Sequence, residues 1–162
     1  MSDAVIIRDG RPGDAGALAR LANALSVHEG LGAAVFTEAG VRRDFFAADG
    51  RLSCIVAETP SGEVVGYLLY QDLYNTDRAG WGLFMLDLYV DDGLRGKGVG
   101  RALVARLAAK AVKRKAVSIW WGVMSANGGA RDFYRILGAT DDDARLLGIE
   151  GGDLQRLAAE DS

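Results

Sequence analysis

The chain has 162 residues, with 19 Lys or Arg against 22 Asp or Glu for a net charge of −3, and 49% of its residues are hydrophobic. This length and composition exclude a disordered or fibrous chain and suit one hydrophobic core, so we expect residues 1–162 to form a single domain. One Cys and one His exclude a disulfide framework and a zinc cluster, and we expect no bound metal.

The N-terminal half predicts two helices and three strands. Asp14 can cap a helix whose leucines recur at helical spacing, and Gly30-Leu31-Gly32 would end it. Thr37 can cap a second, shorter helix. Runs of β-branched and aromatic residues bounded by turn residues predict the strands. These strands are residues 4–8, 52–58 and 64–70.

The C-terminal half predicts a buried strand, an amphipathic helix and a mixed tail. The stretch 75–80 reads as a loop, and the helix that follows the buried strand has the clearest apolar stripe in the chain. The predicted elements are a strand at 83–90, a helix at 99–112, a strand at 118–123, a helix from Asn127 to Leu137 and a last strand at 144–149. Helices and antiparallel strands that alternate irregularly indicate an α+β domain.

The charge is distributed unevenly along the chain. Nine of the basic residues lie between Gly93 and Arg131, where there is no acidic residue. A local cationic block in an acidic protein indicates a local anionic partner. Nucleic-acid binding would need aromatic residues among these charges, and the stretch 95–115 has none, so we expect no nucleic acid. The sequence also has no signal-peptide pattern and no run of ~20 apolar residues, so we expect a cytoplasmic protein without membrane binding.

A glycine-rich turn lies at the start of the basic block. Gly96, Gly98 and Gly100 alternate between the buried strand and the amphipathic helix, so backbone N–H groups and a helix N-terminus can converge on an anion. A phosphate-binding P-loop would need Ser or Thr where Gly98 follows Gly96-Lys97, and a dinucleotide fingerprint would need Gly where Arg101 stands. The sequence therefore excludes both of these phosphate sites.

The segment Arg95-Gly96-Lys97-Gly98-Val99-Gly100 resembles the pyrophosphate loop of the GNAT superfamily of acyl-CoA-dependent N-acyltransferases. The stretches "LDLYV" and "WWGVMSANGGARDFYRILGAT", Thr37-Glu38 and the tail "ARLLGIEGGDLQRLA" resemble its diamine (spermidine/spermine and thialysine) N-acetyltransferase branch. The resemblance implies a GNAT fold, with a mixed, mostly antiparallel, twisted sheet that has a splayed central strand pair and about four flanking helices. It also implies a homodimer.

The resemblance implies transfer of the acetyl group of acetyl-CoA to a primary amine of a small molecule, by direct attack in a ternary complex. The backbone at Leu88, Tyr89 and Val90 would hold the pantetheine arm and polarise the acetyl carbonyl. Tyr134 would be the general acid that protonates the leaving thiolate. The remaining residues implied to bind acetyl-CoA are Arg95, Gly96, Lys97, Gly98, Val99, Gly100, Arg101, Asn127 and Arg131.

The chain departs from this branch at the acceptor side. The branch has Glu-Asp where this chain has Leu86-Asp87, and an aromatic residue where this chain has Asp77. His28-Glu29 stands where the branch has Tyr-Glu. Glu29 or Asp87, acting through water, is therefore the expected base, with His28 as a third candidate. His28, Glu29, Asp77 and Asp87 are the expected acceptor-binding residues.

The loss of the expected Glu leaves two interpretations open. One is an acetyltransferase for an amine other than a simple polyamine, such as an amino acid, an aminoglycoside-like amine or a lysine analogue. The other is a degenerate acyl-CoA-binding sensor that keeps the glycine-rich loop and has lost the base. Tyr134, which is retained, favours the enzyme.

Overall fold

The computed structural model describes residues 4–32 and 35–161. These described residues divide into two compact units, with the boundary between Met124 and Ser125. The first unit holds β1 (Ile6–Asp9), η1 (Pro12–Asp14), α1 (Ala15–His28), α2 (Glu38–Phe45), β2 (Ser53–Glu58), β3 (Val64–Asn75), β4 (Gly80–Val90), η2 (Asp92–Leu94), α3 (Val99–Lys113) and β5 (Ile119–Trp121). The second unit holds α4 (Gly128–Ile136) and α5 (Gly151–Ala158). None of the helices in the described ranges is long and apolar enough to cross a membrane.

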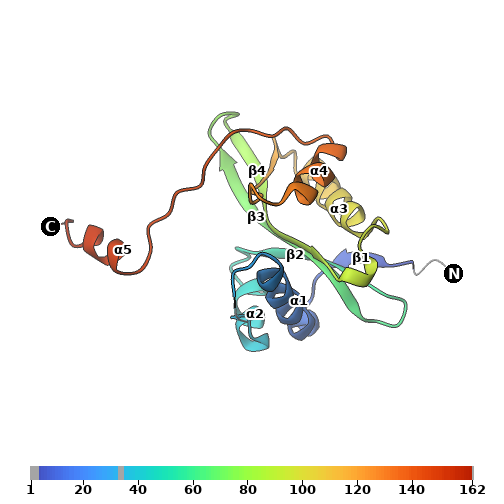
Figure 1. Cartoon of the computed structure of the whole chain (residues 1–162). Helices are drawn as coiled ribbons and strands as arrows, with labels where there is room; N and C mark the ends of the chain where they lie inside the picture. The colour runs from blue at the N-terminus through green and yellow to red at the C-terminus, as the bar shows by residue number, and fades with distance from the viewer. Residues whose placement is uncertain (1–3, 33–34, 162) are drawn as a thin grey trace. The chain divides into compact units, whose positions relative to one another are not determined.

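A mixed sheet in the order β1-β2-β3-β4-β5 forms the centre of the first unit (Figure 1). Its first four strands are antiparallel neighbours, and β5 pairs parallel to β4. The α+β fold class and the mostly antiparallel sheet expected from the sequence are thus confirmed.

The β3–β4 hairpin is longer than the sequence indicated. Its register runs from Gly66 opposite Val90 to Asn75 opposite Gly80. Asn75 holds the tight turn, because its Oδ1 accepts from the Arg78 N–H at 3.0 Å while its Nδ2 donates to Ser118 Oγ at 2.9 Å. The expected loop at 75–80 is therefore a turn, and both flanking strands extend to it.

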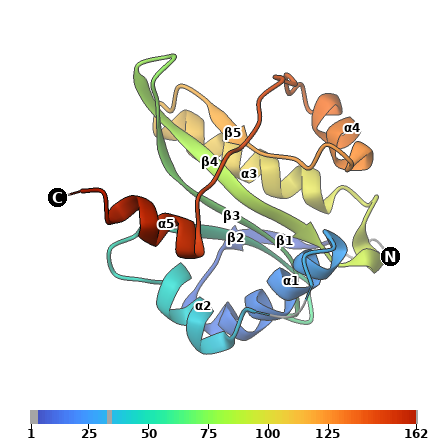
Figure 2. The same ribbon diagram turned by 60° about the vertical axis from the view of Figure 1, so that its left-hand side comes forward.

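Helices cover both faces of the sheet. Figures 1 and 2 show α1 and α2 on one face and α3 on the other. Tyr67, Leu69 and Tyr89 point to the first face, where they join the cluster of α1 and α2 side chains. On the second face, a Cβ at Gly66 would lie 3.5 Å from a methyl of Leu103 in α3. Because side chains alternate along a strand, the two faces have separate sets of residues.

The end of α1 and the start of α2 are as the sequence predicts. The expected cap at Asp14 is wrong, because its carboxylate makes no cap bond to α1 and instead accepts from Arg8 and from the Arg11 N–H. At the end of α1, Leu31 N–H donates to Ser26 C=O at 2.9 Å and Gly30 N–H to Val27 C=O at 3.0 Å. Gly30 has a φ of 73°, so these bonds form a Schellman motif that fixes Glu29 at the helix end. At the start of α2, Thr37 Oγ1 accepts from Gly40 N–H at 3.1 Å.

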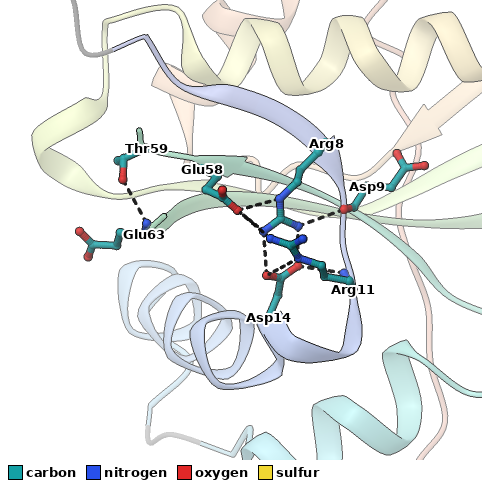
Figure 3. Close-up of polar contacts among 7 residues, drawn as sticks. All are labelled: Arg8, Asp9, Arg11, Asp14, Glu58, Thr59 and Glu63. Carbon is teal, nitrogen blue, oxygen red and sulfur yellow. Dashed lines mark hydrogen bonds and ion pairs between the residues drawn. The ribbon is translucent and has the colours of Figure 1, made fainter. Parts of the chain in front are cut away.

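An ion cluster ties the N-terminal strand to η1 and β2 (Figure 3). The guanidinium of Arg8 donates to both carboxylate oxygens of Asp14, at 2.7 and 2.9 Å, and to Oε2 of Glu58. The Arg11 N–H also donates to Asp14, at 2.9 Å. Asp14 is buried, so these bonds replace the water that its carboxylate loses on folding.

The predicted last strand at 144–149 is wrong. Residues 139–150 form no helix or strand, and Leu146 and Leu147 are 88% and 95% exposed. A strand needs a neighbouring strand for its backbone, and the described part of the second unit contains only helices. The helix α5 after Gly151 was not expected, because the paired glycines at its start masked its short apolar repeat.

Candidate functional site

The strand β4 has an open edge where it leaves β5. The two strands pair only at Leu83, Phe84 and Met85, whereas β4 continues to Val90. A bulge marks the separation, because the register shifts so that Asp87 faces Leu69 and Met85 faces Tyr70. A bulge bends its strand and re-aims it, so it separates the end of β4 from β5. The splayed central strand pair is therefore present.

Backbone groups on this edge are left for a ligand. Asp91 N–H donates to Val65 C=O at 2.9 Å, on the β3 side of the sheet. Because N–H directions alternate along a strand, Tyr89 also points its N–H toward β3, while Leu88 and Val90 point theirs to the open side. Of the three residues expected to contact pantetheine, two thus present a backbone donor on this edge.

The glycine-rich turn follows β4 after the short η2 and leads into α3. Gly96 and Gly98 have φ values of 73° and 85°, in the left-handed region that favours glycine, and Gly98 is the N-cap of the helix. The first backbone bond into the helix comes from Ala102 N–H to Gly98 C=O, at 3.0 Å. The N–H groups of the first turn, including that of Gly100, therefore have no partner within the helix and can bind an anion.

The cations around this turn have different roles. Arg95 is bound to the protein itself: its Nε donates to Val90 C=O at 3.0 Å, its Nη1 lies 2.9 Å from Asp92, and its guanidinium carbon lies 5.0 Å from the centroid of the Tyr89 ring. By contrast, Lys97 and Arg101 make no ion pair with any described residue. These two side chains are the ones at the turn that remain available to an anionic ligand.

Further along α3, acidic residues elsewhere in the fold neutralise much of the basic block. Arg106 and Lys110 pair with Asp9 of β1, at 3.5 and 2.8 Å, and Arg114 pairs with Asp72 of β3 at 3.0 Å. The cationic character seen in the sequence is thus partly used to attach α3 to the sheet.

The carboxylates of Glu29 and Asp87 lie near each other on the face of the sheet that α1 covers. Glu29 is the C-cap of α1, and Asp87 is half-buried on β4. Partial burial and then the charge of Asp87 raise the pKa of Glu29, although the neighbouring His28 lowers it. Burial also raises the pKa of Asp87. The structure therefore brings together three of the predicted acceptor-side residues, because Asp87 lies near His28 and Glu29 although it is 58 positions beyond Glu29 in sequence.

A tyrosine that was not among the predicted site residues contacts this pair of carboxylates. The hydroxyl of Tyr67 donates to Oδ2 of Asp87 at 2.8 Å. Tyr67 lies in the strand predicted at residues 64–70, and its side chain is fully buried. A polar hydroxyl on the inward face of a buried strand was the available signal, but its partner depends on the β3–β4 register, which the sequence did not fix.

Asp77, the fourth residue expected to bind the acceptor, lies far from Glu29 and Asp87 in the same chain. It lies in the exposed turn between β3 and β4, whereas Asp87 follows Gly80 by seven positions along β4. At ~3.3 Å per residue, that length of strand separates them by roughly 23 Å.

The remaining candidates belong to the second unit. Asn127 caps α4, since its Oδ1 accepts from Ala130 N–H at 3.1 Å, as its sequence position predicts. Arg131 pairs with Asp141, with Nη2 2.6 Å from Oδ2. Tyr134 lies on the same helix, in an edge-to-face contact with Phe133 at 5.1 Å between ring centroids.

No metal centre is found in the described ranges: no group of three or more His, Cys, Asp or Glu side chains there is placed to hold an ion.

Comparison with known proteins shows a consistent relationship. Residues 24–139 match the model of the acetyltransferase (GNAT) family. The chain is 34% identical to a thialysine N-epsilon-acetyltransferase of Bos taurus, over 96% of this chain and 94% of that protein. It is 30% identical to spermidine/spermine N(1)-acetyltransferase-like protein 1 of Homo sapiens, over 96% of this chain and 23% of that longer protein. An integron cassette protein of V. cholerae has a similar structure, with a TM-score of 0.80 and 26% identity over 98% of both chains.

Proposed function

The chain belongs to the GNAT acetyltransferase family, and from this premise we propose that it transfers the acetyl group of acetyl-CoA to a primary amine of a small molecule. The observation that carries the proposal is that one strand, β4, brings together three features that the reaction needs. The strand β4 presents Asp87 on one face, free backbone donors at Leu88 and Val90 on its open edge, and the anion-binding turn at its end.

The residues of this strand and turn fit acetyl-CoA. A pyrophosphate needs converging N–H groups and positive charge, which the turn at Gly96 and Gly98, the N-terminus of α3, Lys97 and Arg101 provide. The amide groups of a pantetheine arm need backbone partners, which the open edge at Leu88 and Val90 provides. We assign Asn127 and Arg131 to the pantetheine by the resemblance, although Arg131 already pairs with Asp141.

In the proposed reaction, the neutral amine attacks the thioester carbonyl carbon in a ternary complex. The new C–N bond forms as the C–S bond breaks, the proton lost by the amine goes to Asp87 through water, and the leaving thiolate takes a proton from Tyr134. The products are the N-acetyl amine and CoA. The N–H of Leu88 or Val90 would stabilise the negative charge that develops on the carbonyl oxygen.

The acceptor side favours a cation. Glu29 and Asp87 are two carboxylates whose pKa values are raised, so a positively charged ligand between them would relieve an unfavourable arrangement. Glu29 also lies at the C-terminus of α1, where the helix dipole attracts positive charge. We propose that Glu29 binds the arriving ammonium. Asp87, next to the Leu88 donor, takes the first proton of this ammonium through water and passes it to solvent, so that it can accept the second proton when the neutral amine attacks.

The acceptor that we propose is not a simple polyamine. Leu86, at the bulge, replaces the glutamate of the diamine branch and removes one of the charges that would bind an extended polycation. An amino acid, a lysine analogue or an aminoglycoside-like amine remains compatible with the Glu29–Asp87 pair. The same pair counts against the sensor interpretation, since it supplies a base despite Leu86.

We further propose that both units act as one domain in a cytoplasmic homodimer. The family match at residues 24–139 continues across the boundary between the units. The exposed Leu146 and Leu147 provide apolar surface for a second copy. The one cysteine, Cys54, is a free buried thiol, which suits a reducing compartment.

Release of CoA, followed with a thiol reagent across a panel of amines, tests the function. We expect amine-dependent release with an amino acid or lysine analogue as a better substrate by kcat/KM than spermidine. Acetyl-CoA binding without release for any amine would instead support the sensor, and spermidine as the best substrate would contradict the assigned acceptor class.

A further inference from the structure

We propose that Tyr67 is a positioning residue for the acceptor site: its buried hydroxyl donates to Oδ2 of Asp87 and fixes this carboxylate, so that Oδ1 is held toward the acceptor amine. This inference rests on the proposed function, because it gives Asp87 a substrate to act on.

The geometry of the two strands sets this contact. Tyr67 faces Tyr89 across the β3–β4 pair, and Asp87 lies two positions before Tyr89 on the same face. Tyr67 is thus diagonal to Asp87, a position from which a long side chain reaches its neighbour. Its ring is 0% exposed and packs in the cluster formed with α1, so the hydroxyl has a defined position when it donates to Asp87 at 2.8 Å.

The second oxygen of Asp87 remains available to a ligand. The hydroxyl of Tyr67 is the hydrogen-bond partner that the structure gives the carboxylate, and it binds Oδ2. Among the described residues, no buried side-chain oxygen or nitrogen lacks a hydrogen-bond partner. Since Oδ1 has none, it is not completely buried, and we infer that an amine can approach it.

The hydroxyl also controls the charge of Asp87. Burial raises the pKa of Asp87, and the hydrogen bond from Tyr67 lowers it again toward the ordinary range. Glu29, at the end of α1, interacts electrostatically with Asp87, while His28 lies near Glu29 and Tyr89 lies near Tyr67. Loss of the hydroxyl would leave burial unopposed, so Asp87 would take up a proton at a higher pH.

Tyr67→Phe tests the inference, with Tyr70→Phe as the matched control. Both changes remove one phenol oxygen from a buried ring of β3, but Tyr70 lies beyond the register shift and faces away from Asp87. In Tyr67→Phe we expect the acid limb of kcat/KM for the acceptor to move up by about one pH unit. We also expect the KM for acetyl-CoA to stay within about twofold. Tyr70→Phe should leave the acid limb in place.

Two further measurements separate positioning from a general packing effect. In an Asp87→Asn background, Tyr67→Phe should cause no further change in kcat/KM, because the two residues act through one contact. The carboxyl 13C resonance of Asp87, followed by NMR as the pH is changed, should titrate at a higher pH in Tyr67→Phe than in the wild-type chain.

The NMR titration does not depend on activity. If the wild-type chain acetylates no amine, the proposed function fails, while the titration still decides whether Tyr67 controls the charge of Asp87. An unchanged acid limb together with an unchanged Asp87 titration in Tyr67→Phe would overturn the inference.

Discussion

The Nε of Arg95 donates to the carbonyl oxygen of Val90 at 3.0 Å, which ties the start of the glycine-rich turn to the last residue of β4. The same guanidinium lies against the Tyr89 ring and pairs with Asp92. Arg95 therefore holds the backbone donors of β4 and the glycine-rich turn in a fixed relation, so it has a structural role as well as a positive charge.

Arg95→Ala should raise the KM for acetyl-CoA about tenfold, because the turn loses its attachment to β4. Arg95→Lys should restore little of this loss, since a lysine cannot reproduce the planar fork that contacts Val90, Asp92 and Tyr89 together. Steady-state kinetics with acetyl-CoA varied would measure both effects. Full recovery of KM in Arg95→Lys would show that charge alone is needed.

Lys97→Ala and Arg101→Ala should each raise the KM for acetyl-CoA several-fold and weaken its dependence on salt. These side chains are the unpaired cations at the turn, so their attraction to a pyrophosphate is screened by ions. Lys113→Ala, at the opposite end of α3, is the control and should change neither quantity. Equal effects of all three substitutions would indicate a diffuse electrostatic role without a site at the turn.

Asp87→Asn should lower kcat about 100-fold, as expected for loss of a general base, whereas Glu29→Gln should mainly raise the KM for the amine. Burial raises the pKa of both carboxyl groups, so kcat/KM should fall on the acid side at a pH above the ordinary carboxyl range near 4. A pH profile of each variant would measure this. Retention of the acid limb in both variants would exclude the pair as its source.

Asp14→Asn should destabilise the fold by about 1–3 kcal/mol at pH 7, because Arg8 would lose the first of its two carboxylate partners and keep only Glu58. Burial raises the pKa of Asp14, but the hydrogen bonds from Arg8 and the Arg11 N–H, together with the charges of both arginines, outweigh it, and the net pKa is lowered. The stabilisation is therefore present above the ordinary aspartate pKa and is lost as the pH falls through the lowered value.

Urea unfolding at several pH values would measure this difference. Asp49→Asn breaks an exposed pair with Arg51 and should cost less than about 0.5 kcal/mol. A cost for Asp14→Asn that is equally small, or that does not shrink at acid pH, would contradict a stabilising role of the cluster.

Local patterns in the sequence predicted the features that depend on neighbouring residues. The Schellman end of α1 at Gly30, the caps at Thr37 and Asn127, and the turn at Gly96 and Gly98 all follow from residue types at fixed offsets. Each needs only a few consecutive residues, so a single sequence contains the necessary information.

Features that depend on register or on distant partners were not predictable in the same way. The Tyr67–Asp87 bond requires the alignment of β3 with β4, which includes a bulge. The engagement of Arg95 with Val90 depends on how the turn folds back. The wrong prediction of a strand at 144–149 also concerns a distant partner. An apolar run forms a strand only if another strand lies beside it, and none does here among the described residues.

Mass spectrometry of the products formed from acetyl-CoA and a mixture of primary amines tests the central claim most directly. We expect one class of amine, an amino acid or a lysine analogue, to gain a single acetyl group in the presence of the protein, with an equal amount of CoA released. The product should be lost in Asp87→Asn. Failure of the folded, acetyl-CoA-binding protein to acetylate any amine would contradict the proposed function.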